Sequence, residues 1–350
     1  MALVPHVVAL TRGDAGVRLD LVLRRRLTDV TGVTRTRVQR WIESGLVTVN
    51  DARVHHASTR AAYGDVVAVS LPADRTRQPP AAEDLPLDVL FEDDHVLAVN
   101  KPAGLVVHPT YKHTSRTLLN GLLWHARSWA DGRRPSLVGR LDRLTSGVVL
   151  VAKTPAVHAR LQQSFAAGQG EKDYLALVYG TAREAQGQID LPLGRDRQDR
   201  RRVVVSEHGA PSVTRFERLT SVSAPRAGLT LLRCRLVTGR MHQIRVHLAA
   251  QGWPIVGDSV YGEARWPMVA DPMVADALRV FPRQALHAWR VGVPHPTTGA
   301  WLVIHAPIPE DLDNLIATTG LVASPQGRSP HPTPLTPLSH QLGRMAHSGT

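Results

Sequence analysis

The chain has 350 residues, 43% of them hydrophobic, and is therefore long enough for two or three domains with packed cores. Its single cysteine, Cys234, excludes an intramolecular disulfide, argues against a cysteine-based zinc site and indicates a reducing cytosol. The sequence has no charged leader and no apolar run near the ~20 residues of a membrane span, so we expect a cytoplasmic protein without a membrane partner. The formal net charge of +12 favours a polyanionic partner such as nucleic acid, although a basic enzyme from an arginine-rich proteome would carry the same charge.

A first domain is predicted over residues 17–71, after an N-terminal extension over residues 1–16. Apolar residues at helical spacing from Leu19 onward predict one helix, and a second helix is predicted over residues 34–44. The alternating pattern around the turn at Asn50-Asp51 predicts a hairpin, which a last short strand follows.

Both helices of this domain carry arginines on their polar faces. Such a surface would neutralise RNA phosphates without reading bases, whereas the other interpretation is a solvated charged face on a small structural domain. The arrangement resembles the RNA-binding domain of ribosomal protein S four. The residues that match it are Arg18, Leu19, Asp20, Arg37, Ile42, Gly45, Val47, Val49, Asn50, Gly64 and Asp65. From this resemblance we expect RNA contacts by Arg18, Arg35, Arg37 and Arg40.

Residues 72–86 are rich in Pro, Asp and Arg and show no periodicity, which predicts a linker. A larger domain is predicted over residues 87–318, and it opens with two short apolar strands and a turn that begins at Lys101. We interpret Lys101 as a structural or RNA-contacting residue, because a lone lysine in a turn is usually solvated. Residues 319–350 are rich in Ser, Pro, His and Thr and contain no acidic residue, so we expect a disordered tail.

The stretch over residues 138–154 contains a carboxylate in unusual surroundings. Asp142 lies between Arg140 and Arg143, whose positive charges favour its ionised form. A tight turn follows, and then an apolar run to Ala152 predicts a fully buried strand. The pattern fits a catalytic acid beside a rigid strand, but it also fits an ordinary loop ion pair ahead of a core strand.

Two further segments of the larger domain bear on function. Residues 171–178 predict a strand that contains Tyr174, and a tyrosine in such a strand is normally a core residue with its hydroxyl bonded at the edge. Residues 193–207 contain five arginines and predict a hairpin that faces RNA backbone, or a mobile charged loop.

A strand over residues 229–237 leads to a predicted helix over residues 241–251, with Arg245 in its first turns. His242 and His247 are five residues apart, which is the wrong spacing for two metal ligands on one helical face, so we expect no metal site. The sequence contains neither a phosphate-loop lysine nor a dinucleotide-binding glycine motif, so we also expect no cofactor.

Four separated motifs of the larger domain, in the same order, resemble those of the RluA family of RNA pseudouridine synthases. Their patterns are EDxxxxxxNKPxGxxVHP, HRLDxxTSGxxxxAKT, KxYxALVxG and TGRxHQIRVHLAAxGxPIVGDxxYG. The matching residues include Lys101, His108, Arg140, Asp142, Gly147, Lys172, Tyr174, His242, Arg245, Asp258 and Tyr261. The chain departs from the family at three positions. Gly139 and Trp253 each replace a usual His, and Met241 replaces a usual Thr or Ser.

The resemblance implies an α+β fold, in which a small RNA-binding domain is joined to a mixed, mostly antiparallel sheet flanked by helices. It implies isomerisation of uridine to pseudouridine, with Asp142 as nucleophile and Arg245 holding it charged and oriented. It further implies that Tyr174 stacks on the target base and that Arg140 fills the gap left when that base flips out. We expect an RNA partner, with large-subunit ribosomal RNA favoured over transfer RNA, and a monomeric protein.

Two other classes of protein remain open. A non-catalytic RNA-binding or ribosome-assembly factor would keep the fold, but the intact set of Asp142, Tyr174 and Arg245 argues against it. A carboxylate-dependent hydrolase of nucleosides or glycosides usually needs a second acid opposite the first, and none stands out in the sequence.

Overall fold

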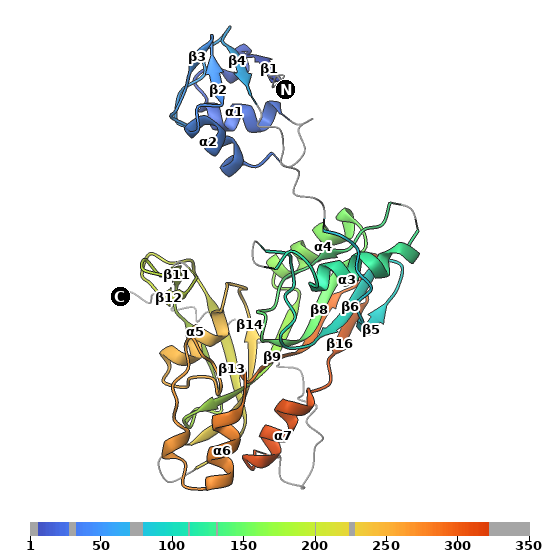
Figure 1. The fold of residues 1–350 in the computed structure, drawn as a ribbon, viewed down its shortest axis with the longest axis vertical. Helices are drawn as coiled ribbons and strands as arrows, with labels where there is room; N and C mark the ends of the chain where they lie inside the picture. Colours follow the sequence, from blue (N-terminus) through green and yellow to red (C-terminus); the bar gives the residue numbers. More distant parts are fainter. Residues whose placement is uncertain are drawn as a thin grey trace, which may run out of the picture. The chain divides into compact units, whose positions relative to one another are not determined.

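The computed structural model describes residues 6–27, 33–70, 80–110, 113–130, 132–199, 201–223 and 228–321. Contacts divide the chain into two compact units, one that ends at Pro79 and one that begins at Pro80. The first unit is the blue ribbon of Figure 1. Most of the predicted linker and nearly all of the predicted tail lie outside the described residues.

The first unit combines two helices with a four-stranded antiparallel sheet of strand order β1-β4-β2-β3. Apolar residues from both helices, among them Leu23 and Ile42, share one core with Val67 of the sheet. The predicted hairpin is confirmed, because Asn50 and Asp51 have φ values of 47° and 65°, as a two-residue turn of type I′ requires. The elements are β1 (His6–Ala9), a 3₁₀ turn (Arg12–Asp14), α1 (Leu19–Arg26), α2 (Arg35–Glu43), β2 (Val47–Val49), β3 (Ala52–Arg53) and β4 (Val66–Val69).

The second unit is built on a ten-stranded sheet with the path β10-β13-β14-β9-β15-β8-β6-β5, to which β16 and β7 add at β15 and β8. Among the described strands, β8 and β15 form the one parallel pair. The predicted α+β fold with a mixed, mostly antiparallel sheet is therefore confirmed. The strands are β5 (Asp88–Glu92), β6 (Val96–Lys101), β7 (Ser136–Leu137), β8 (Ser146–Ala152), β9 (Glu171–Tyr179), β10 (Gln186–Asp190), β11 (Leu193–Arg195), β12 (Val203–Val205), β13 (Val213–Val222), β14 (Leu229–Leu236), β15 (Leu286–Pro294) and β16 (Trp301–His305).

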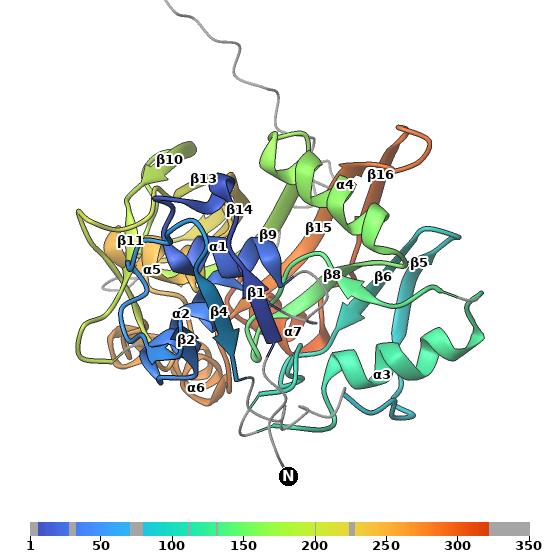
Figure 2. The same cartoon turned by 90° about the horizontal axis from the view of Figure 1, so that it is seen from above.

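Helices flank this sheet in two groups. They are α3 (Leu118–His125), α4 (Pro155–Ala166), α5 (Gln243–Ala250), α6 (Pro272–Val280) and α7 (Glu310–Thr318). In Figure 2, α3 and α4 lie on the side of β5, β6 and β8, whereas α5 and α6 lie on the side of β13 and β14. Asp142 precedes β8, Tyr174 belongs to β9 and Arg245 belongs to α5, so these residues meet where the two halves of the unit join.

Three predicted boundaries differ from the observed ones. The separate N-terminal extension is wrong, because β1 pairs with β4 along its whole length. This strand has only four residues, and its pairing with β4, far along the chain, does not follow from the local sequence. At the other end of the linker, the Asn120 side chain donates to the Ala81 carbonyl at 2.7 Å, so residues 80–86 run along α3. The predicted tail begins too early, because Leu321 is buried beyond α7.

Candidate active site

The loop that carries Asp142 is fastened to the rest of the unit. The Thr145 N–H donates to the Asp142 carbonyl at 3.1 Å and closes a tight turn. The Thr145 hydroxyl accepts a hydrogen bond from Gln284 Nε2 at 3.1 Å, and the Ser146 hydroxyl bonds His287 Nδ1 at 2.9 Å. These anchors reach β15 and the segment before it, so the turn next to Asp142 has little freedom to move.

The turn after Asp142 requires a glycine at position 147. The residue has a φ of 115°, a backbone conformation that side chains disfavour. A Cβ atom at this position would lie 2.2 Å from the carbonyl oxygen of Ala288 on the parallel neighbour β15. Any larger residue would push β8 away from β15 and shift the loop that holds Asp142.

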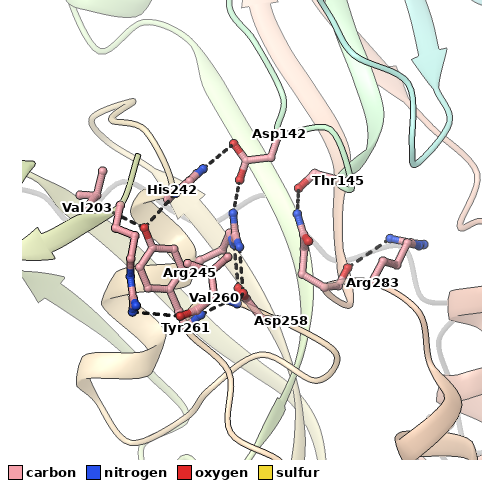
Figure 3. Close-up of polar contacts among 11 residues, drawn as sticks. Asp142, Thr145, Val203, His242, Arg245, Asp258, Val260, Tyr261 and Arg283 are labelled. Atoms are coloured by element: carbon pink, nitrogen blue, oxygen red, sulfur yellow. Dashed lines mark hydrogen bonds and ion pairs between the residues drawn. The ribbon is translucent and has the colours of Figure 1, made fainter. Parts of the chain in front are cut away.

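Arg245 joins Asp142 to a second, more deeply buried carboxylate, as Figure 3 shows. Its Nη1 donates to Asp142 Oδ2 at 2.9 Å, while Nε and Nη2 form a bidentate pair with Asp258 at 2.6 and 2.8 Å. Asp258 also accepts hydrogen bonds from the N–H groups of Val260 and Tyr261. Burial alone would lower the pKa of Arg245, but its contacts with the two carboxylates raise it above the ordinary value. Arg245 is therefore a fixed positive charge facing Asp142.

His242 faces the other carboxylate oxygen of Asp142. Its Nε2 lies 3.7 Å from Asp142 Oδ1, and its Nδ1 lies 2.9 Å from the hydroxyl of Tyr261. The residue has a φ of 55°, in the left-handed region, so α5 begins at Gln243 and not at Met241 as predicted. Burial lowers the pKa of His242, which favours a neutral ring near pH 7.

A cleft of about 760 Å³ opens beside Asp142, and Arg140 lines it from an exposed position. A smaller pocket of about 140 Å³ joins Asp142 and Arg245 to Tyr174, which is 9% exposed. Burial, followed by the negative charge of Asp142, raises the pKa of Tyr174, so its hydroxyl stays protonated. The structure thus brings together all three residues that the sequence singled out for chemistry.

Lys172 is a cleft residue that the sequence reasoning passed over. It lines the cleft with Arg140, its ammonium lies 3.8 Å from the centroid of the Phe165 ring, and among the described residues it has no ion-pair partner. Burial lowers the pKa of Lys172 to about 8. A Cβ atom on Gly139 would lie 3.7 Å from its Nζ, so a side chain at position 139 would contact this lysine. Its place in the KxYxALVxG motif is the sequence signal that could have identified it.

From the sequence we interpret Lys101 as a structural or an RNA-contacting residue, and the second of these interpretations is wrong. The residue is fully buried, and its Nζ donates to the carbonyls of Pro102, Leu105 and Arg143 at 2.7, 3.0 and 3.1 Å. Burial lowers the pKa of Lys101 to about 7. Because the turn folds back over its own lysine, Lys101 fastens that turn to the loop after Asp142.

The four arginines expected to bind RNA lie on the first unit in different surroundings. Arg18 and Arg35 both pair at 3.0 Å with Asp20, whose side chain is fully buried. Arg37 stacks on an aromatic ring of its own helix, and Arg40 is exposed. Part of the positive charge that the sequence assigned to RNA is therefore balanced inside the unit, because α1 supplies an acid between the two helices.

Comparisons with known proteins agree with this fold. Residues 95–250 match the family described as RNA pseudouridylate synthase. The chain is 40% identical over 313 residues to the ribosomal large subunit pseudouridine synthase D of Nitrosomonas europaea, a match that covers 89% of this chain and 87% of the relative. It is 37% identical over 312 residues to the synthase of the same name from Vibrio cholerae, covering 88% and 94%. Among solved structures, the human RNA pseudouridylate synthase domain containing 4 shares the fold with a TM-score of 0.53 and 22% identity, covering 67% of this chain and 93% of that one.

The fold and the extent of these matches define an RNA-modifying enzyme. The chain belongs to the family of RNA pseudouridine synthases and isomerises uridine in RNA to pseudouridine. No helix in the described part of the chain is both long and apolar enough to cross a membrane.

Proposed function

We propose that this protein converts specific uridines of large-subunit ribosomal RNA to pseudouridine, with Asp142 as its nucleophile. The observation that carries the role of Asp142 is its contact with the buried, doubly paired Arg245 in a pocket that Tyr174 shares. The choice of RNA rests on the relatives, which are named as ribosomal large subunit synthases and are 37 to 40% identical over most of both chains.

The reaction rearranges bonds without a net change in composition. The bond between C1′ of the ribose and N1 of uracil breaks, the ring turns, and a bond forms between C1′ and C5. The C5 proton leaves and N1 gains a proton, so neither an oxidant nor an energy source is consumed. A stacked base cannot reach a side chain, so the target nucleotide must first flip into the pocket.

Each residue of the pocket has a distinct part in this proposal. Asp142 attacks the flipped nucleotide as a carboxylate, and Arg245 holds one of its oxygens so that the other faces the pocket. Tyr174 offers its ring to the uracil, with a hydroxyl that stays protonated. Lys172, which has no ion-pair partner among the described residues, supplies positive charge for an RNA phosphate.

Arg140 is expected to occupy the space that the flipped base leaves, since it is exposed and lines the cleft next to Asp142. Arg140→Ala should therefore slow single-turnover conversion of a uridine in a structured stem-loop more than conversion of the same uridine in a flexible single strand. Rates measured on both RNAs with one enzyme preparation check this. Equal slowing on the two would instead assign Arg140 to local electrostatics around Asp142.

The first unit is expected to supply affinity and not chemistry, because its exposed arginines lie on a separate core. A chain that begins at Pro80 should need more RNA for half-maximal rate, while its rate at saturating RNA stays close to that of the full chain. Its binding should also depend less steeply on salt, because fewer phosphates are neutralised. Loss of the saturated rate in a truncated protein that is still folded would contradict this division of labour.

Mapping pseudouridine in total RNA with and without this gene tests the proposed substrate most directly. A site that disappears from large-subunit ribosomal RNA supports it, a site lost from transfer RNA would replace it, and no lost site would favour a non-catalytic factor. A hydrolase would release free uracil, which the purified protein should not do. We also propose a monomer in the cytoplasm, and light scattering of the purified protein checks the oligomeric state.

A further inference from the structure

The hydroxyl of Tyr261 is held between two partners, both drawn in Figure 3. The backbone N–H of Val203 donates to this hydroxyl at 2.8 Å, and a backbone N–H can only donate. The oxygen is therefore an acceptor toward Val203, and the hydroxyl proton remains to be donated elsewhere. Among the described residues, the atom within reach to accept this proton is His242 Nδ1 at 2.9 Å.

An Nδ1 atom that accepts a hydrogen bond cannot carry the proton of a neutral imidazole. His242 must then carry its proton on Nε2, which is the atom that lies 3.7 Å from Asp142 Oδ1. The opposite tautomer would turn a lone pair toward the Asp142 carboxylate and would leave the Tyr261 hydroxyl proton without an acceptor among the described residues. Two separate contacts, one on each ring nitrogen, therefore select the same tautomer.

We propose that Tyr261 fixes the tautomer of His242, and that His242 is a positioning residue that holds the Asp142 carboxylate through its Nε2–H. This inference rests on the proposed role of Asp142. Arg245 restrains Oδ2 and the imidazole N–H faces Oδ1, so the carboxylate is confined from both sides. The separation of 3.7 Å is longer than a formed hydrogen bond, and such contacts shorten when substrate binds.

The donor that locks Tyr261 comes from the arginine-rich hairpin of β11 and β12. Val203 is the first residue of β12, and the preceding Arg202 lies with its guanidinium 5.6 Å from the centre of the Tyr261 ring. Arg202 also donates to the carbonyl of Val260 at 3.1 Å. RNA bound to this hairpin would therefore act on the segment that contacts Tyr261, the residue that sets the tautomer of His242.

The charges that face His242 give the sign of its pH dependence. Burial lowers its pKa most, the nearby charge of Arg245 lowers it further, and Asp142 and Asp258 raise it. Tyr261 adds a donor that favours the neutral ring. Protonation leaves the proton on Nε2 and adds one on Nδ1, so the ring no longer accepts from Tyr261 and pairs with Asp142 as a cation. A carboxylate paired with an imidazolium is a weaker nucleophile, so the rate should fall as pH drops toward the lowered pKa of His242. In Tyr261→Phe that donor is gone, so the pKa should rise and the acid limb should move to higher pH.

The first measurement is the ¹⁵N spectrum of the full chain labelled at histidine, in the absence of RNA. The signals of His242 are assigned by their loss in His242→Asn, because asparagine tolerates a left-handed backbone. We expect protonated Nε2 and unprotonated Nδ1 in the wild type. A wild type with its proton on Nδ1 would overturn the inference even if the enzyme is fully active. A lack of pseudouridine formation would instead contradict the proposed function, and the inference about the tautomer would still stand.

The second measurement compares Tyr261→Phe with Tyr179→Phe, which removes the hydroxyl of a buried tyrosine outside the pocket. Tyr261→Phe should lower the saturated rate about tenfold or more, the effect of a misplaced reacting group, and leave RNA affinity within about threefold. Its acid limb should shift to higher pH, whereas the pH profile of Tyr179→Phe should match that of the wild type. An unchanged tautomer and an unchanged acid limb in folded Tyr261→Phe would contradict the proposal.

Discussion

Asp142→Asn should lower pseudouridine formation by at least about 10⁴-fold, the scale of loss seen when a covalent catalyst is removed. Asparagine keeps the shape of the side chain but removes both its charge and its nucleophilic oxygen. The side chain is 26% exposed, and Arg245 keeps its bidentate partner Asp258, so folding should change little. RNA affinity should also stay close to that of the wild type, because the cleft retains its cations Arg140 and Lys172.

The matched control is Asp94→Asn in the same unit. Asp94 pairs with Arg133 at 3.0 Å, its side chain is 80% exposed, and it does not line the cleft. Single-turnover rates on a ribosomal RNA fragment should be unchanged in this variant. If folded Asp142→Asn still converts its RNA within about tenfold of the wild-type rate, a barrier change of only ~1.4 kcal/mol, Asp142 is not the nucleophile.

The site could be anticipated from sequence where a residue's surroundings are local. The turn after Asp142, the buried strand β8 and the position of Arg245 in α5 all follow from patterns within a few residues. Their meeting in one pocket was expected only because four motifs matched a known family in order. The partner contacts of His242 and Asp258 were not expected, because both depend on the path of the chain between α5 and Tyr261.

Strand alternation misleads in the centre of the sheet for a physical reason. In β14, the alternation of Arg233 and Arg235 with apolar residues is typical of one wet face and one dry face. Both arginines are nevertheless buried, because neighbouring strands supply acids, and Arg235 forms a bidentate pair with Asp173 at 2.6 and 2.9 Å. Glu171 bonds Arg235 at 2.7 Å as well. From the sequence alone, charged residues of this kind are predicted to be exposed, because the acids that pair with them lie on another strand.

Arg245→Met should both unfold the protein more readily and remove its activity. Methionine fills a similar volume but leaves Asp258, 6% exposed, as an unpaired buried charge, which costs about 3–5 kcal/mol of unfolding free energy. Asp142 also loses its orienting cation, so the saturated rate should fall even at temperatures where the variant is folded. Urea unfolding at pH 7 and single-turnover rates on the same preparation measure the two effects.

The pH dependence of this destabilisation identifies its cause. In the wild type, burial raises the pKa of Asp258, but its hydrogen bonds and the charge of Arg245 outweigh burial and hold the pKa below its usual value. Its stabilising contribution is thus present above the ordinary Asp value of about 3.9 and is lost as pH falls below it. In Arg245→Met, burial dominates and the pKa of Asp258 rises, so the folded state takes up a proton and the variant should lose less stability at pH 5 than at pH 7.

Removing the charge of Asp258 as well completes a double-mutant cycle. Arg245→Met with Asp258→Asn should recover most of the lost unfolding free energy, because no deeply buried charge is then left unpaired, but it should not recover activity, because Asp142 still lacks Arg245. Arg279→Met, which breaks an exposed pair with Asp276, is the control for loss of an arginine on the surface. A double variant no more stable than Arg245→Met would mean that the cost comes from packing around the guanidinium, whereas a double variant with restored activity would remove Arg245 from the orientation of Asp142.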